Sequence, residues 1–272
     1  MGWLRGPLAT YRALDGGPVV SGSVPLNVMS WGAPDAPRTL VALHGITSNG
    51  GAMTELARPL ADRGWRVLAP DMRGHGESGR GNGDFSFDAL LDDIAAAVPA
   101  APDMLLGHSF GGALAQLGVL SGRFAPQALL LEDPVSHFAD KETPLGMLNW
   151  DEANITRGID GILELNPGWS RRDAAWKLLS LEQMAFDDAR AAFAGNAPWD
   201  LRDYAAQLAA ARPTVWALPG TSRFVPPGDV ARLKAEAGDA AVRIFPEAGH
   251  SIHRDETDKF IDMLLSLAEL AA

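Results

Sequence analysis

Cysteine is absent from this chain of 272 residues. Its absence excludes catalysis by a thiol, disulfide bonds and metal sites made of thiolates, and it leaves the redox compartment open. Long apolar segments are missing too, because no run of eighteen apolar residues occurs and residues 1–10 have no long apolar core after Arg5. The sequence therefore predicts a soluble, cytoplasmic protein that does not act at a membrane.

Basic residues are fewer than acidic ones, with 23 Lys and Arg against 34 Asp and Glu and a formal net charge of -11 at pH 7. A nucleic-acid groove needs basic side chains that neutralise phosphates, so this class of partner is excluded. The length suits one domain with an insertion. We expect a small-molecule substrate, while the oligomeric state, monomer or homodimer, stays open.

Short apolar runs bounded by glycines, prolines and polar residues alternate with longer segments of helical pattern, such as residues 53–63 and 87–98. Continuous apolar runs of this length are typical of strands buried on both faces, and their alternation with helices is typical of a parallel sheet. The eight expected strands are residues 11–14, 26–31, 38–43, 65–70, 104–107, 128–131, 213–218 and 241–246.

One turn in this pattern has the sequence Gly107-His108-Ser109-Phe110-Gly111. An apolar strand leads into it and a run rich in alanine and leucine follows, which indicates a strand, a very tight turn and a helix. Glycines on both sides of the serine let the strand and helix backbones pass closely, and such a turn lifts the serine hydroxyl clear of the sheet. The motif also occurs as an ordinary glycine-rich turn, so the flanking chain must decide its meaning.

Two further motifs precede this turn, in a fixed order and each after a predicted strand. Together the three are His44-Gly45, Asp71-x-Arg73-Gly74-His75-Gly76-x-Ser78 and Gly107-x-Ser109-x-Gly111. On these motifs the chain resembles the α/β-hydrolase family, and the resemblance extends to Glu247-Ala248-Gly249-His250-Ser251. It implies a mostly parallel eight-stranded sheet with helices on both faces. The predicted division is a core of residues 1–133 and 212–272 with a helical cap, residues 134–211, inserted after the sixth strand.

A serine hydroxyl becomes a nucleophile only when a base takes its proton, and the chain has six histidines. The resemblance places the base in the loop after the last strand, at His250 in preference to His253, which we expect to be exposed at a helix entrance. His108 is expected to pack beneath the turn. In the resembling family the histidines of the two earlier motifs, His44 and His75, shape the site without acting as bases.

An oxyanion hole needs two hydrogen-bond donors aimed at the oxygen that becomes negative. The backbone amide of Phe110 is one, because it follows the serine at the start of a helix. The resemblance places the second at the amide of Ile46, directly after His44-Gly45.

The acid of the triad departs from the common pattern. It usually follows the seventh strand, but Gly220-Thr221-Ser222 leads to Arg223, and a cation cannot stabilise an imidazolium. A glutamate that closes a wholly apolar strand needs a partner, which favours Glu132 at the end of the sixth strand. Zearalenone-type lactonases place their acid there, two residues before a proline. Asp133, which could instead bond to turn amides, and Asp229, expected to cap a helix, remain alternatives.

The segment from about residue 134 to residue 212 loses the strand pattern and contains helix signals, among them the capping box Ser170-x-x-Asp173 and a helix start at Asp200. It holds four of the eight tryptophans, Trp150, Trp169, Trp176 and Trp199. Some of these could line a pocket beneath the cap, and some could form the cap's own core. The predicted pocket residues are His44, Trp150, Trp176 and Met184; Arg223 is expected to be a solvated loop residue, with binding of a substrate carboxylate as the alternative.

These features predict a serine hydrolase that cleaves an ester or lactone of a small, largely apolar substrate through an acyl-enzyme, with no metal and no organic cofactor. Serine at the turn, where dehalogenases and epoxide hydrolases of this family carry aspartate, argues against those two reactions. Carbon-carbon bond hydrolysis and cofactor-free perhydrolysis use the same triad and stay open. A ligand-binding protein with little turnover is the alternative outside enzymes.

Overall fold

The computed structural model describes residues 24–81, 83–138, 146, 148–149, 151–152 and 155–271. The expected first strand, residues 11–14, and the predicted pocket residue Trp150 lie outside the described residues. Within them, no helix is both long and apolar enough to cross a membrane.

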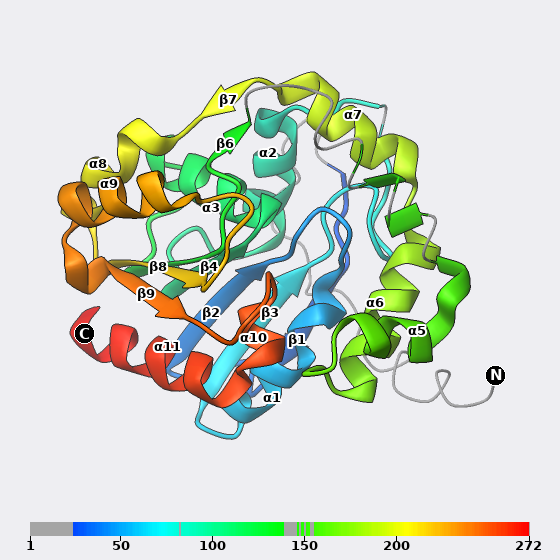
Figure 1. Cartoon of the computed structure of the whole chain (residues 1–272), viewed down its shortest axis with the longest axis horizontal. Coiled ribbons are helices and arrows are strands. Elements are labelled where there is room, and N and C mark those ends of the chain that lie inside the picture. The colour runs from blue at the N-terminus through cyan, green and yellow to red at the C-terminus, as the bar shows by residue number, and fades with distance from the viewer. Residues whose placement is uncertain are drawn as a thin grey trace.

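A seven-stranded sheet forms the centre of the molecule, with the strand order β1-β3-β2-β4-β5-β8-β9 (Figure 1). Strand β1 is antiparallel to β3, and all other neighbours are parallel. The strands are β1 Val28–Trp31, β2 Arg38–Leu43, β3 Trp65–Pro70, β4 Met104–His108, β5 Ala128–Glu132, β8 Thr214–Pro219 and β9 Val242–Phe245. They correspond to the other seven expected strands, so the predicted fold class is confirmed.

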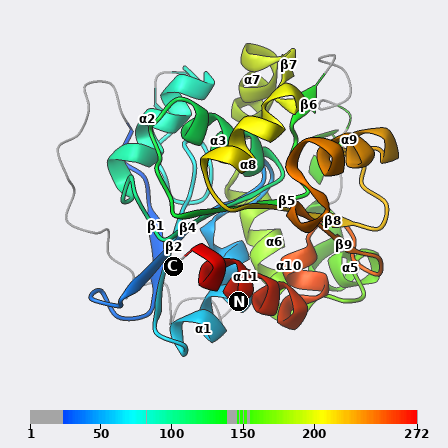
Figure 2. The same cartoon turned by 90° about the vertical axis from the view of Figure 1, so that its left-hand side faces the viewer.

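Helices cover both faces of the sheet, and Figure 2 shows the sheet between the two layers. Two separate groups of buried apolar residues lie between the sheet and these layers. One layer consists of α1 Thr54–Ala61, α10 Ile252–Asp255 and α11 Thr257–Ala271. The other contains α2 Phe87–Ala97, α3 Phe110–Leu120, α8 Ala205–Ala211 and α9 Pro227–Ala237. Short 3-10 turns are η2 Gly50–Met53 and η5 Asp239–Ala241.

The central strands β4 and β5 are buried along their whole length, which explains why neither has a charged or polar side chain before its last residue. Their parallel register places His108 beside Glu132, the last residue of each strand. The residues that follow, Ser109 and Asp133, therefore leave the sheet at the same edge. This edge, at the carboxyl ends of parallel strands, is where open α/β sheets bind ligands.

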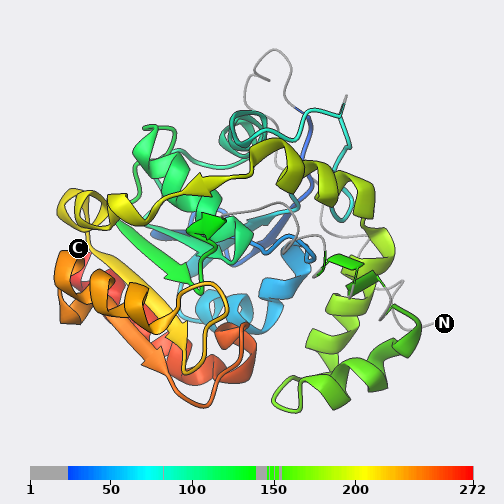
Figure 3. The same ribbon diagram turned by 45° about the horizontal axis from the view of Figure 1, so that its top comes forward.

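The chain between β5 and β8 forms a small two-stranded sheet and most of the remaining helices; Figure 3 shows it passing along one side of the molecule. Its described elements are β6 His137–Phe138, η3 Ile155–Arg157, α5 Gly158–Leu165, α6 Arg171–Gln183, α7 Phe186–Asn196, β7 Trp199–Asp200 and η4 Arg202–Tyr204. The predicted capping box is confirmed, because Ser170 Oγ accepts from the Asp173 amide and the Asp173 carboxylate accepts from the Ser170 amide.

The prediction that a helix begins at Asp200 is wrong for its first residues. Asp200 pairs with His137 as the last residue of β7, and its carboxylate accepts hydrogen bonds from the amide and guanidinium of Arg202. These contacts keep the backbone extended at Asp200, so regular α-helix starts only at Ala205.

Candidate active site

Ser109 occupies the predicted tight turn between β4 and α3. Its φ and ψ of 56° and -117° lie outside the regions that suit residues other than glycine, a strain that costs about 1–3 kcal/mol. A Cβ on Gly107 would collide with the carbonyl of Gly111, and one on Gly111 with the carbonyl of Leu43. The two glycines therefore allow the close passage of strand, helix and neighbouring loop that holds the serine in this conformation.

The backbone of Ser109 is held on both sides. Its amide donates to the carbonyl of Glu132 at 3.0 Å, and its carbonyl accepts from the amides of Gly112 and Val135 at 2.9 and 3.0 Å. Its hydroxyl makes no hydrogen bond to any residue in the described part of the chain. Ser109 also lines a cavity, so its unbonded hydroxyl is available to a molecule that binds there.

His250 follows β9, as expected, and shares a cavity with Ser109. Its Nδ1 lies 2.7 Å from Oδ2 of Asp133, a carboxylate whose residue is 1% exposed. The other oxygen of Asp133 accepts from the hydroxyl of Ser222 at 2.5 Å. A carboxylate that holds an imidazole through Nδ1 fixes its orientation and leaves Nε2 available as a hydrogen-bond acceptor or base.

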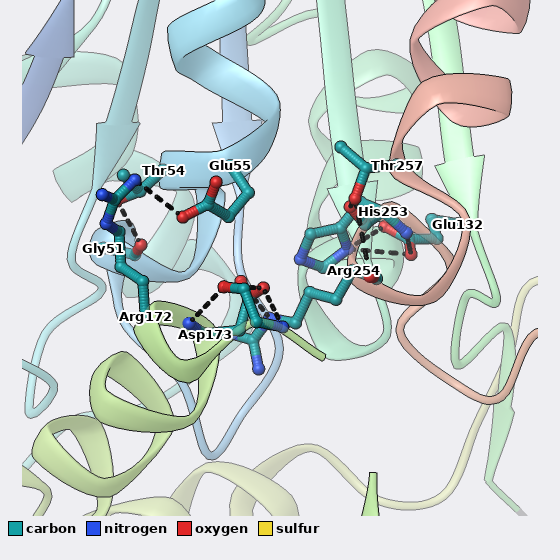
Figure 4. A network of polar contacts seen from close by, with 10 residues as sticks. Gly51, Thr54, Glu55, Glu132, Arg172, Asp173, His253, Arg254 and Thr257 are labelled. Carbon is teal, nitrogen blue, oxygen red and sulfur yellow. Dashed lines mark hydrogen bonds and ion pairs between the residues drawn. The ribbon is translucent and has the colours of Figure 1, made fainter. Parts of the chain in front are cut away.

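Glu132, the preferred acid in the sequence, does not contact His250. Its Oε1 accepts from the backbone amide of His253 at 2.9 Å, and both carboxylate oxygens lie 2.8 Å from His253 Nδ1 (Figure 4). Side chains alternate between the faces of a strand, so Glu132 points to the α10 side while Asp133, with a φ of 37°, turns to the cavity. The assignment of Glu132 as partner of His250 is therefore corrected to Asp133.

His253, which pairs with Glu132, is only 1% exposed. The prediction that His253 is an exposed residue is therefore wrong. Burial raises the pKa of Glu132, but its interactions with the rings of His253 and His108 and its hydrogen bonds from His253 outweigh burial and lower that pKa to about 2. Glu132, His253 and His108 each offer one ligand atom, and these three atoms lie within 4.8 Å of one another. They are close enough to hold a metal ion. Because the Glu132 oxygens already bind His253, the trio fits a buried acid-histidine pair better.

Asp229, the third candidate for the acid, and Arg223, which follows Gly220-Thr221-Ser222 where the acid usually stands, have other surroundings. Asp229 is in the first turn of α9, where Pro226 is the N-cap, so its expected capping role is wrong; its carboxylate lies 3.4 Å from Arg202. Arg223 is exposed at the cavity. The residue that the sequence reasoning missed is Ser222, whose hydroxyl donates to Asp133 and accepts from the amides of Phe224 and Val225.

His108 is buried, as expected, and carries a polar contact as well. Burial lowers the pKa of His108 well below its usual value, so its ring is neutral and Nε2-H donates to the carbonyl of His250 at 3.0 Å. The two rings lie 4.7 Å apart, and Phe224 lies 4.9 Å from the His250 ring on another side. These contacts position the His250 backbone and ring.

The two predicted oxyanion donors are the amides of Phe110 and Ile46. Phe110 is the first residue of α3, where an amide has no acceptor within the helix. His44 Nδ1-H donates to the Gly45 carbonyl at 2.7 Å, and because carbonyl and N-H point in opposite directions across a peptide, the Ile46 amide faces away from His44. Neither amide donates to a described residue.

His44 is fully buried and lies behind the site. Burial, with a further contribution from His75, lowers the pKa of His44 to about 3. The ring is therefore neutral, and its Nε2 accepts from the Met72 amide at 3.0 Å. Its role in the structure is to hold the Gly45-Ile46 peptide, so the prediction that it lines the substrate pocket is corrected.

A cavity of about 710 Å³ opens beside Ser109 and His250. The predicted pocket residues Trp176 and Met184 do not line it: Trp176 packs on Gly51, and Met184 belongs to the apolar core. The inserted segment contributes other side chains instead, namely Leu148, Asp151, Leu165, Trp169, Lys177 and Phe193. Consecutive helical residues point in directions about 100° apart, which separates Lys177 from Trp176.

Comparison with known proteins gives concordant results. The family model described as the alpha/beta hydrolase family matches residues 40–263. The AB hydrolase superfamily protein YfhM of Bacillus subtilis is 30% identical over 138 residues, 48% of each chain, so the match spans about half of that relative. The sn-1-specific diacylglycerol lipase ABHD11 of Mus musculus is 26% identical over 282 residues, 88% of this chain and 84% of the relative. The solved N-formylmaleamic acid deformylase of Pseudomonas putida S16 has a TM-score of 0.71 at 23% identity, covering 89% of this chain and 96% of that one.

Proposed function

The chain belongs to the alpha/beta hydrolase family, and we propose that it is a serine hydrolase that cleaves an ester or lactone through an acyl-enzyme intermediate. The observation that carries the proposal is that one cavity is lined both by Ser109, on its strained turn, and by His250, whose Nδ1 is held by the buried carboxylate of Asp133. The similarity to a diacylglycerol lipase supports ester hydrolysis.

In the first half of the reaction, His250 Nε2 takes the proton of Ser109 as the serine oxygen attacks the substrate carbonyl. Asp133 keeps the imidazole in the correct tautomer and stabilises its positive charge. The amides of Ile46 and Phe110 donate to the carbonyl oxygen as it becomes negative. His250 then gives its proton to the leaving alcohol oxygen, and the acyl group stays on Ser109.

In the second half, water enters the site and gives a proton to His250 as it attacks the acyl-enzyme carbonyl. The same two amides stabilise the second oxyanion. Collapse of this intermediate releases the acid, and the proton on His250 returns to Ser109. Each step uses the same imidazole in alternating roles, which is why its orientation by Asp133 matters throughout.

Of the segment predicted as a cap, residues 134–211, the described elements from β6 to η4 act in this proposal as the cap over the site, whereas α8 belongs to the layer on the sheet. The cap supplies Trp169 and Phe193 to the cavity, whose volume is within the ordinary range for sites that bind small molecules. The substrate is therefore a small molecule with an apolar portion that contacts these rings.

The proposal is tested with a fluorophosphonate probe and a short activated ester. We expect the probe to label Ser109, steady turnover to follow any burst, and Ser109→Ala to abolish both. Exposed Ser266, on the outer part of α11, provides the matched control Ser266→Ala, which keeps both activities. Ligand binding without labelling or turnover would instead support a non-catalytic binding protein.

A further inference from the structure

Arg254 is a buried cation in the wall of the cavity. Its side chain is only 3% exposed, and it follows His253 on α10. Its Nε has no hydrogen-bond partner, and no acceptor in the described residues receives a bond from the rest of its guanidinium. A guanidinium has five N-H donors and stays charged at neutral pH, so a buried one normally finds acceptors.

Two neighbours position this guanidinium without using its donors. Trp169 stacks on it, with the guanidinium carbon 4.3 Å from the ring centroid. Asp173 lies 3.7 Å from Nε, too far for a hydrogen bond, and Figure 4 shows the two side chains directed toward each other. The Asp173 carboxylate is meanwhile held by Ser170 in the capping box of α6. The nearby carboxylates of Asp173, Glu132 and Asp255 compensate part of the charge, and none of them accepts a hydrogen bond from the guanidinium.

The other charged groups around the cavity are either paired or exposed. Lys177 donates to the carbonyl and hydroxyl of Thr47 and to Asp151, which accounts for its three N-H groups. Asp255 accepts from the Gly249 amide. Glu247 and Arg223 are exposed. Arg254 is thus a buried charged residue at this cavity whose guanidinium donates no hydrogen bond to any of the described residues.

We propose that the substrate carries a carboxylate that binds Arg254 while its scissile carbonyl lies at Ser109. This inference rests on the proposed hydrolase function and names its substrate class: esters or lactones that retain a free carboxylate, such as hemiesters of dicarboxylic acids. A carboxylate matches the planar fork of a guanidinium and can accept two parallel hydrogen bonds from it. Trp169 orients the fork, and the apolar side chains of the cavity contact the carbon chain between the two ends.

The test compares hemiesters with neutral esters of equal chain length. The 4-nitrophenyl hemiesters of glutaric and adipic acid are paired with 4-nitrophenyl pentanoate and hexanoate, and spontaneous hydrolysis is subtracted. We expect the wild type to prefer the hemiester in at least one pair by about 10- to 100-fold in kcat/KM, the range for hydrogen bonds to a charged group. Arg254→Gln should remove this preference, mainly through KM, and Arg254→Lys should keep part of it.

Arg172→Gln is the matched control, because Arg172 is an exposed arginine on α6 that pairs with Glu55 (Figure 4). Neither residue lines the cavity. We expect this variant to keep both the rates and the preference. The ratio of the two kcat/KM values within one variant cancels any loss of folded enzyme. The inference is overturned if the wild type shows no preference for either hemiester, or if Arg254→Gln retains it.

A second measurement does not depend on turnover. Glutarate should raise the melting temperature of the wild type more than glutaramide does, and Arg254→Gln should lose this difference. If neutral esters are cleaved without a carboxylate preference, the carboxylate inference fails and the hydrolase proposal stands. If no ester is cleaved and Ser109 is not labelled, while glutarate still stabilises the wild type through Arg254, the hydrolase proposal fails and the anion site stands.

Discussion

We predict that substitutions at the adjacent residues Glu132 and Asp133 have different effects, one mainly on stability and the other mainly on the catalytic rate. Asp133 holds His250 beside the cavity, and Glu132 holds His253 in the core. The substitutions Asp133→Asn and Glu132→Gln each replace one carboxylate oxygen with an NH2 group and so turn the carboxylate into an amide of nearly the same size. The side-chain volume is kept, so the two variants report on charge and hydrogen bonding at two sites one residue apart.

For Asp133→Asn we expect kcat to fall by about 10³- to 10⁴-fold, because an amide neither fixes the correct tautomer of His250 nor stabilises its positive charge. KM should change little, since the carboxylate does not contact substrate. The melting temperature should stay close to that of the wild type, because the amide can still accept from the hydroxyl of Ser222.

For Glu132→Gln we expect the opposite profile. Both oxygens of Glu132 contact His253, and both residues are buried, so placing an amide nitrogen against the ring costs about 3 kcal/mol. In a protein of this size that corresponds to a melting temperature lower by roughly 6–12 °C. The rate at a temperature where the variant is folded should fall less than tenfold.

The assay is the hydrolysis of a short activated ester under conditions where each variant is folded, together with thermal unfolding followed by circular dichroism. Asp229→Asn is the control, because Asp229 lies in the first turn of α9 near Arg202 and should change neither quantity appreciably. A larger rate loss in Glu132→Gln than in Asp133→Asn would refute the assignment of the two pairs.

Three further predictions follow from contacts around these pairs. Ser222→Ala should lower kcat for the same ester about tenfold, because it removes one hydrogen bond to a charged group, Asp133. Ser222→Thr, which keeps a hydroxyl that can donate to Asp133, should retain more activity. His44→Leu should lower kcat by about 10²- to 10³-fold with a smaller effect on KM, because the Ile46 amide loses its orientation. The control is His137→Asn, at a partly exposed histidine, which should leave kcat unchanged. An unchanged kcat in His44→Leu would contradict the role of His44. In urea titrations, wild-type stability should decline as pH falls below 6.5, because the unfolded chain takes up protons on His44 and His108 before the folded one does; for His44 the decline continues toward about 3. A further decline should run from 4.5 toward about 2 as Glu132 is protonated, and Glu132→Gln should lose this second part.

The sheet could be predicted because its strands leave a simple pattern. Strands β2, β3, β4, β5 and β8 are buried on both faces, so each is a short apolar run between polar or glycine-rich turns. The turn at Ser109 was equally predictable, since the glycines on both sides reflect a steric requirement. Local sequence records such requirements directly.

The acid could not be assigned from the sequence, and the reason is geometric. The argument that a buried glutamate needs a partner is correct for Glu132, but the partner is His253. Glu132 and Asp133 point to opposite sides of the sheet edge, and His250 and His253 lie only three residues apart, one before α10 and one within it. Which carboxylate meets which histidine depends on how this segment crosses the end of β5, and this is a tertiary feature with no local signal.

Helix orientation limited the prediction of the cavity in the same way. The sequence places two tryptophans, Trp169 and Trp176, and one lysine on or near α6, and tryptophan is the more obvious pocket residue. In the structure Trp176 packs against Gly51, whose lack of a side chain admits the ring, while Lys177 reaches the cavity and bonds to Thr47. Only the position of α6 against the core decides between the two, and residues far away in the sequence set that position.

The pairing at the end of β5 also bears on why Ser222 stands in the loop after β8. A carboxylate supplied from β5 reaches His250 from the neighbouring strand, and its second oxygen then points toward the β8 loop. A second carboxylate at that place would repel Asp133, whereas a hydroxyl donates to it and is itself held by two backbone amides. Introducing Ser222→Asp should therefore lower kcat below that of Ser222→Ala, although it restores an acid to the family's usual loop. A rate equal to that of the wild type would show that the loop after β8 can supply the acid, and that the position of Asp133 is not required.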